Sequence, residues 1–274
     1  MNIKLFQIDA FAEEQFSGNP AAVIPLDHWL EDDLMQQIAM ENNLSETTFY
    51  VPAENGFEIR WFTPIIEVNL CGHATLACAH VLFNHYDYKE KTIRFHSKSG
   101  ELLVSKEEDF YSMTLPTDIL KQVSTPVEIL KAFGIESMET YRGRDDYMII
   151  VESQRIIESL NPDFKMLVTL ENCRGVIITA RGNKVDFVSR CFFPKAGIDE
   201  DHATGSALTT MTPYWAKILK KEEFSVIQLS KRKGVFKSKY LNEKCVISGK
   251  AITYSIGEIF IAKSKLKAIQ QVNI

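Results

Sequence analysis

The alternation of apolar and polar residues along the chain predicts a protein built mainly from paired strands. Residues 3–10 alternate with a period of two, and an apolar run at 21–24 follows Gly18-Asn19-Pro20, so two strands flank a loop. Further pairs of β-forming segments, separated by short polar or glycine-containing links, are typical of hairpins. These pairs are 47–51 with 57–62, 102–105 with 111–115, 176–180 with 185–189, and 246–248 with 252–255.

Helical segments interrupt the strands. The clearest is 31–42, where the apolar residues share one face, acidic residues lie at the start and two asparagines mark the end. Antiparallel strands mixed with a few helices favour an α+β fold over a parallel βαβ sheet. Each half of the chain would wrap its strands around its most apolar helix, 75–84 or 205–220. The remaining helices are expected near 127–133 and 156–168.

The chain also nearly repeats itself once. Arg60–Pro64 and the His-Ala-Thr at 73–75 resemble Arg190–Pro194 and the His-Ala-Thr at 202–204, at a nearly constant offset. Two copies indicate two similar half-domains, the alternative being a duplication kept only for packing. Proline and threonine near residue 118 mark the expected boundary, which divides the chain into half-domains 1–118 and 119–274. The C-terminal tail is expected to pack back on the first half-domain.

Composition and charge exclude several functions. Hydrophobic residues make up 45% of the 274, and the formal net charge is −5 with no sustained basic stripe, which disfavours a nucleic-acid or anionic-membrane surface. The one basic cluster, Lys231-Arg232-Lys233, is interpreted as a solvated hairpin turn. No apolar run reaches about eighteen residues and no apolar signal core follows the first residues, so a cytoplasmic protein is expected.

Dedicated cofactor and metal motifs do not occur in the sequence. The five cysteines form no CxxC and are odd in number, as expected of reduced thiols. The six histidines show no ligand spacing, so no metal site is expected. Neither GxGxxG nor GxxxxGK[ST] occurs, which removes the usual indication of a nucleotide. Catalysis is therefore expected to use side chains alone, with no cofactor.

Glu46 is the first candidate for chemistry. When the two halves are aligned it falls opposite Gly175, so only one half carries a carboxylate at this position. Glu46 lies between a helix end and a strand start, among apolar neighbours. Burial at such a place disfavours the charged form of a carboxyl group, which suits a residue that must both take and return a proton. The alternative is an exposed turn carboxylate.

The two helix starts carry the other candidates. His73 follows Gly72 where the positive end of the helix dipole opposes protonation, so a neutral imidazole is expected, the alternative being a packed histidine. The thiol of Cys71 can have a depressed pKa there and act as an acid or base. Asp201 and Ser206 are equally suited to capping or binding. Two helix starts facing each other across a cleft would hold a small carboxylated molecule.

Several motifs together resemble the phenazine-biosynthesis isomerase (PhzF-like) family. They are SGNPAAV at 17–23, NLSET at 43–47, WFTP at 61–64 with CGHAT at 71–75, and GIDED at 197–201 with TGSA at 204–207. The resemblance runs over essentially the whole chain. It implies the diaminopimelate-epimerase fold, in which two pseudo-symmetric halves, each a mostly antiparallel curved sheet around a central helix, enclose the site between them. It also implies a homodimer.

The resemblance implies a role for particular residues. The glutamate of the NLSET-type motif is the group that moves a proton in that family, so this role would fall on Glu46. His73 and Asp201 would be the other catalytic residues. The groups near the substrate would be Asn19, Ser206, and the backbone N–H groups of Gly72 and Gly205.

Residues and resemblance together predict a cofactor-independent isomerase. Glu46 would shift a proton on a small carboxylated amino or hydroxy acid in the cleft. One alternative is an epimerase with two opposed bases, for which Asp201 or Cys71 could assist Glu46, and another is a non-catalytic ligand-binding homologue. Two departures from the family pattern, Asn69 for an acid and His202 for a proline, remove no catalytic group.

Overall fold

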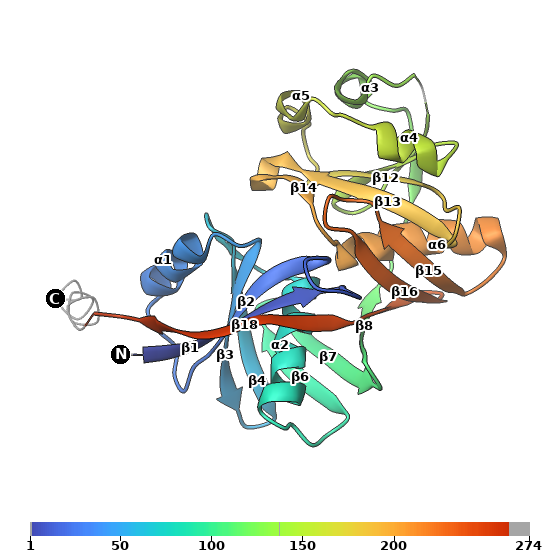
Figure 1. Cartoon of the computed structure of the whole chain (residues 1–274). Helices are drawn as coiled ribbons and strands as arrows, with labels where there is room; N and C mark the ends of the chain where they lie inside the picture. Colours follow the sequence, from blue (N-terminus) through green and yellow to red (C-terminus); the bar gives the residue numbers. More distant parts are fainter. Residues whose placement is uncertain (1, 137, 263–274) are drawn as a thin grey trace.

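The structure of the protein, a computed structural model, describes residues 2–136 and 138–262. The chain folds into two bodies, which Figure 1 shows as a lower body coloured mainly blue to teal and an upper body coloured mainly yellow to orange. The last described strand, in red, leaves the upper body and runs across the lower one (Figure 1). Residues 263–274 of the C-terminal tail lie outside the described residues.

The first body is a mostly antiparallel sheet around one helix. Its strands are β1 (Asn2–Ala10), β2 (Asn19–Pro25), β3 (Glu46–Ala53), β4 (Gly56–Phe62), β5 (Glu67–Val68), β6 (Thr92–Ser97), β7 (Gly100–Glu107), β8 (Phe110–Pro116) and β18 (Ala251–Phe260), and its helices are α1 (Asp32–Asn42) and α2 (Gly72–His85). The strands pair in the order β18-β1-β2-β3-β4-β6-β7-β8, with β2–β3 and β4–β6 parallel. Helix α2 packs against six of these strands and is buried over residues 73–82, so it forms the core.

The second body repeats this arrangement. Its strands are β9 (Lys121–Val123), β10 (Glu139–Arg142), β11 (Asp146–Ile150), β12 (Gly175–Arg181), β13 (Phe187–Phe193), β14 (Ile198–Asp201), β15 (Glu223–Gln228), β16 (Gly234–Leu241) and β17 (Lys244–Gly249). They pair in the order β9-β10-β11-β12-β13-β15-β16-β17, with β11–β12 and β13–β15 parallel. Its helices are α3 (Val127–Phe133), α4 (Gln154–Ser159), α5 (Phe164–Val168) and the central α6 (Leu208–Leu219).

The chain crosses between the two bodies twice. Strand β9 follows β8 of the first body but belongs to the second, where it pairs with β10. Strand β18 follows β17 of the second body but belongs to the first, where it pairs with β1. Strands β8 and β17 pair antiparallel and join the two sheets. The predicted boundary near residue 118 falls between β8 and β9 and remains a prediction. The α+β fold with two pseudo-symmetric halves is as predicted. Among the described residues, no helix has the length and hydropathy needed to cross a membrane.

Three sequence predictions of local structure are wrong. The expected helix 156–168 is divided into α4 and α5, because Pro162 disfavours helical backbone before it and Asp163 caps a new helix start. The expected hairpin of 246–248 with 252–255 does not form, because both edges of β17 are already paired, with β16 and β8. The helix expected from residue 205 begins as a 3₁₀ turn at Gly205–Ala207.

The basic cluster at 231–233 is not wholly a solvated turn. Arg232 donates from Nη2 to Oδ1 of Asp9 at 2.8 Å and from Nε to the carbonyl oxygen of Gly18 at 3.0 Å. The side chain of Asp9 is only 2% exposed. Arg232 therefore joins the β15–β16 link of the second body to β1 of the first body. No local sequence pattern predicts this contact.

Candidate active site

A cavity of about 330 Å³ lies between the two bodies. Both bodies contribute to its walls, which bring together side chains far apart in the sequence. They include Glu46, Cys71, Gly72 and His73 from the first body, and Arg144, Arg174, Phe193, Asp201 and Ser206 from the second. Six of the candidate residues thus lie in or beside one space, and Asn19 contacts two of them from behind the wall.

Glu46 lies at the start of β3, just after the turn that ends α1. Asn43 closes that helix in the left-handed region, with φ of 48°, and redirects the chain into the strand. Glu46 is 8% exposed, and its Oε2 lies 2.9 Å from Nε2 of His73. The angles of this contact are not those of a hydrogen bond, and neither atom has another hydrogen-bond partner among the described residues. Glu46 is therefore a buried carboxylate with capacity for a further partner, not an exposed turn residue.

His73 is the second residue of α2, and its ring lies between two groups. Its Nδ1 is 3.6 Å from Sγ of Cys71, and its Nε2 faces Glu46. Burial alone would lower the pKa of His73, but Cys71 and Glu46 outweigh burial and raise this pKa well above 6.5. The expectation of a neutral imidazole is not supported, because Cys71 and Glu46 together raise this pKa by more than burial lowers it.

The contact between His73 and Glu46 predicts a pH-dependent stability. Because the pKa of His73 is raised in the folded protein, the contribution is fully present below about pH 6.5 and is lost as the pH rises through the folded value. In urea titrations, we expect His73→Gln to destabilise the protein more at about pH 6 than at about pH 9. His28→Gln, at an exposed histidine, should show no such difference. A pH-independent loss in His73→Gln would contradict the ion pair.

Cys71 is a buried thiol without the properties of a reactive one. Burial raises its pKa, so the expectation of a depressed value is wrong: desolvation outweighs the position before a helix. The donor atoms of Glu46, Cys71 and His73 lie within 4.8 Å of one another. However, Cys71 and Glu46 face opposite nitrogens of the ring, so the three groups do not converge on one point as metal ligands do.

Asp201 is held in place by a dense set of hydrogen bonds. Its Oδ1 accepts from Nδ2 of Asn19 at 2.7 Å and from the backbone N–H of His202 at 2.9 Å. Its Oδ2 accepts from Oγ1 of Thr204 at 2.5 Å. The bond from Asn19 crosses between the two bodies, because Asn19 begins β2 and Asp201 ends β14. Burial lowers the pKa of the neighbouring His202.

The counterpart of Glu46 in the second body is Gly175, as the aligned halves predicted. Glu46 begins β3, which is parallel to β2, and Gly175 begins β12, which is parallel to β11. A Cβ added at Gly175 would collide with the carbonyl oxygen of Phe192 and the ring of Phe193. The ring of Phe193 thus occupies the space of a side chain, and this wall of the cavity has no carboxylate at the position of Glu46.

The alignment of the two His-Ala-Thr segments is wrong. Helix α2 begins at Gly72, and the helical turn of the second body begins at Gly205, so Ser206 rather than His202 corresponds to His73. The segment between the proline-ending motif and the helix start is longer in the second half than in the first. The aligned repeat therefore needs a gap just before the helix start, which explains the error. Gly72 and Ser206 line the cavity. Gly205 lies behind its wall, where a Cβ would press on a phenylalanine ring at 3.1 Å.

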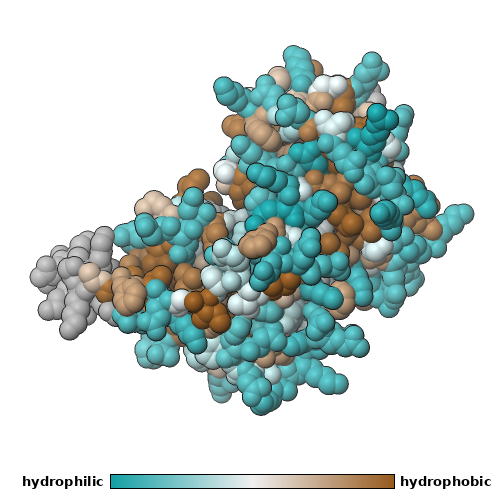
Figure 2. Space-filling model, in the orientation of Figure 1, coloured by the Kyte–Doolittle hydropathy of each residue, from teal (hydrophilic) through white to brown (hydrophobic). Residues whose placement is uncertain are grey.

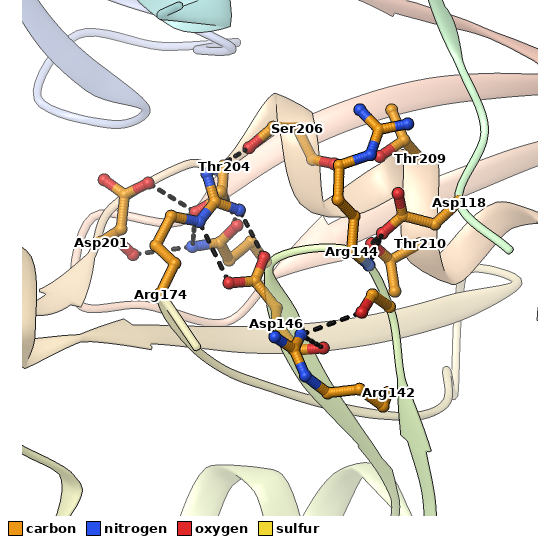
Figure 3. A network of polar contacts seen from close by, with 12 residues as sticks. Asp118, Arg142, Arg144, Asp146, Arg174, Asp201, Thr204, Ser206, Thr209 and Thr210 are labelled. Atoms are coloured by element: carbon orange, nitrogen blue, oxygen red, sulfur yellow. Dashed lines mark hydrogen bonds and ion pairs between the residues drawn. The ribbon is translucent and has the colours of Figure 1, made fainter. Parts of the chain in front are cut away.

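The sequence motifs did not predict a polar network that lies in the second body (Figure 3). Arg174 donates from Nε to Oδ1 of Asp146 at 3.0 Å, from Nη2 to Oδ2 of the same residue, and from Nη1 to Oγ of Ser206 at 3.3 Å. Its guanidinium carbon lies 4.7 Å from the centre of the Phe193 ring. One available signal was that this arginine directly precedes the glycine that corresponds to Glu46.

Two duplicated α+β bodies, with a cavity between them lined by both charged and apolar side chains, define an epimerase-like fold. The chain matches the model of the family described as phenazine biosynthesis-like protein over residues 8–257, and it belongs to that family. A relative from Pseudomonas aeruginosa, named an uncharacterized isomerase, is 47% identical over 261 residues, which cover 95% of this chain and 100% of the relative.

Solved structures agree with this assignment. A PhzF-family crystal structure from Enterococcus faecalis has a TM-score of 0.92 at 43% identity, covering 95% of this chain and 100% of the other. A hydroxyproline epimerase from Agrobacterium vitis, with bound trans-4-hydroxy-L-proline, has a TM-score of 0.58 at 11% identity, covering 94% and 92%, which shows a shared fold alone. The predicted family and fold are confirmed, and the protein is an isomerase-type enzyme.

Proposed function

We propose that the protein is a cofactor-independent isomerase that moves a proton within a small amino or hydroxy acid bearing a carboxylate. The observation that carries this proposal is the buried carboxylate of Glu46, 2.9 Å from His73, at the wall of a cavity between the two bodies. A carboxylate held beside an imidazolium is ready to accept a proton from carbon. The family resemblance further supports a homodimer, and five cysteines without a CxxC motif suit a reducing compartment such as the cytoplasm.

In the proposed reaction Glu46 takes a proton from one carbon of the substrate and returns it to another on the same face. One C–H bond breaks, another forms and the double bond moves between them, so no oxidant is consumed. His73 and Ser206 would stabilise negative charge that develops on the substrate, while Asp201, oriented by Asn19, would accept a hydrogen bond. Proton transfer contributes about 10²- to 10⁴-fold, and electrostatic stabilisation supplies much of the rest.

The cavity favours isomerisation over epimerisation. An epimerase needs a base on each face of one carbon, and the groups that could assist Glu46 in this way are poorly suited to it. Asp201 is held by three hydrogen bonds from the protein, burial raises the pKa of the Cys71 thiol, and Gly175, at the position that corresponds to Glu46, has no side chain. A single base acting on one face suits a proton shift.

Turnover in deuterated water tests the proposal. With a panel of small unsaturated and cyclic amino and hydroxy acids, we expect one compound to show a moved double bond and deuterium at the carbon that receives the proton, both visible by NMR spectroscopy. Inversion of a stereocentre with label at the inverted carbon would instead identify an epimerase. Binding of a panel member with neither change would favour a non-catalytic homologue.

A further inference from the structure

We propose that Arg174 is the residue that recognises the substrate's carboxylate, so that this group lies against the second body while the reacting carbons lie toward Glu46. The identity of the bound group as part of a substrate rests on the proposed function. The binding of a carboxylate at Arg174 does not, because it needs no turnover.

Arg174 is fixed and still has hydrogen-bond donors to offer. The buried carboxylate of Asp146, 3% exposed, accepts from two of its nitrogens, and the ring of Phe193 supports one face of the guanidinium. With the bond to Ser206, three of its N–H groups are used. A guanidinium carries five, and the others have no acceptor within the described part of the chain. A guanidinium locked in this way presents a planar edge suited to a carboxylate.

Ser206 adds a second donor to this corner of the cavity. Because its Oγ accepts a hydrogen bond from Arg174, its hydroxyl hydrogen is directed to another acceptor. Ser206 also lies in the helical turn 205–207 that leads into α6, where backbone N–H groups favour an anion. Figure 3 shows Arg174 reaching from the segment just before β12 across to this turn.

The two bodies present different groups to a bound carboxylate. The first body presents Glu46 with His73 2.9 Å from its Oε2, and the second presents Arg174 and the hydroxyl of Ser206 as donors. The second wall also carries carboxylates, among them Asp146, which is paired with Arg174, so recognition depends on the oriented guanidinium and not on the overall charge of the wall. The pseudo-symmetry accounts for this difference, because the second body replaces the acid with a glycine and precedes that glycine with an arginine.

Arg144 provides a matched control in the same cavity. It lines the cavity and is exposed, and its only hydrogen bond among the described residues is from its backbone N–H to Asp118, at 3.3 Å. Its guanidinium has the same charge as that of Arg174 but no carboxylate or ring to orient it. Comparing the two arginines separates a general effect of positive charge from recognition by an oriented group.

The test is calorimetric binding of benzoate and cyclohex-1-ene-1-carboxylate, each compared with its carboxamide. We expect the wild-type protein to bind at least one carboxylate more tightly than its amide, and Arg174→Gln to weaken that carboxylate about 10- to 100-fold with little effect on the amide. Arg144→Gln should change it less than about threefold. Glu46→Gln should bind the carboxylate at least as tightly as wild type, so a failure of catalysis is distinguishable from a failure of recognition.

Removal of Arg174 leaves Asp146 buried without its partner, which can destabilise the fold. The double variant Asp146→Asn/Arg174→Gln removes both charges and keeps both shapes, and it should lose carboxylate affinity while keeping a cooperative melting transition. Arg174→Lys keeps the charge but not the planar fork and should bind with intermediate affinity. The proposal is overturned if wild type does not distinguish a carboxylate from its amide, or if the double variant binds the carboxylate as wild type does.

Discussion

Glu46→Gln should slow proton exchange between the substrate and solvent by about 10²- to 10⁴-fold. Glutamine has the shape of glutamate but cannot accept a proton from carbon. Its contacts with the cavity are otherwise kept, so ligand affinity should stay within about tenfold, or 1.4 kcal/mol. The measurement is the rate of deuterium incorporation from deuterated water, followed by mass spectrometry alongside direct binding.

Asp118→Asn is the matched control for this change. Asp118 lines the same cavity and loses the same charge on substitution, but its Oδ2 already accepts from Oγ1 of Thr210 at 2.8 Å. We expect its exchange rate to fall less than about tenfold. The base would have to be sought elsewhere if exchange persisted in Glu46→Gln, or if Asp118→Asn lost as much. Melting curves of both variants check that a lost rate is not a lost fold, since His73 loses its charged neighbour in the first.

Elements whose deciding contacts are close in sequence could be predicted from the sequence. The hairpin of β3 with β4 turns at Gly56, whose φ of 119° favours glycine, and α1 ends at the paired asparagines. Strand β18 could not be placed in this way, because its pairing depends on which sheet edge is still free when β17 has found its partners. Such competition between distant strands leaves no local pattern.

The same distinction applies to the site. The duplicated sequence identified Glu46 because a carboxylate opposite a glycine is visible when the halves are aligned. It placed His202 opposite His73 because a gap before the second helical turn changes the register, and only the helix starts reveal that Ser206 is the counterpart. The sequence did not identify Arg174, because its orientation depends on contacts with residues from three other segments of the chain. The roles given to Glu46, His73 and Asp201 remain predictions, although the structure brings these groups to one cavity.

Arg232→Ala should destabilise the protein by about 3–5 kcal/mol, because it leaves the buried carboxylate of Asp9 without its partner. Arg232 also donates to the carbonyl oxygens of Ser17 and Gly18, and the N–H of Gly18 donates to Lys233 at 2.7 Å. These bonds hold the loop between β1 and β2 of the first body against the second. Urea unfolding of the variant, compared with Lys231→Ala, measures the loss. The exposed Lys231 should change stability by less than about 0.5 kcal/mol.

The loss in Arg232→Ala should depend on pH in a direction that the burial of Asp9 determines. Burial raises the pKa of Asp9, while Arg232 acts to lower it, so removal of Arg232 raises that pKa further. The penalty for a buried charge is absent below the unfolded pKa of about 3.9 and grows as the pH rises through it. The variant should therefore lose more stability at about pH 7 than at about pH 4, and an equal loss at both would contradict the role of Asp9. Because Asn19 directly follows this loop and donates to Asp201, ligand binding should weaken in the same variant.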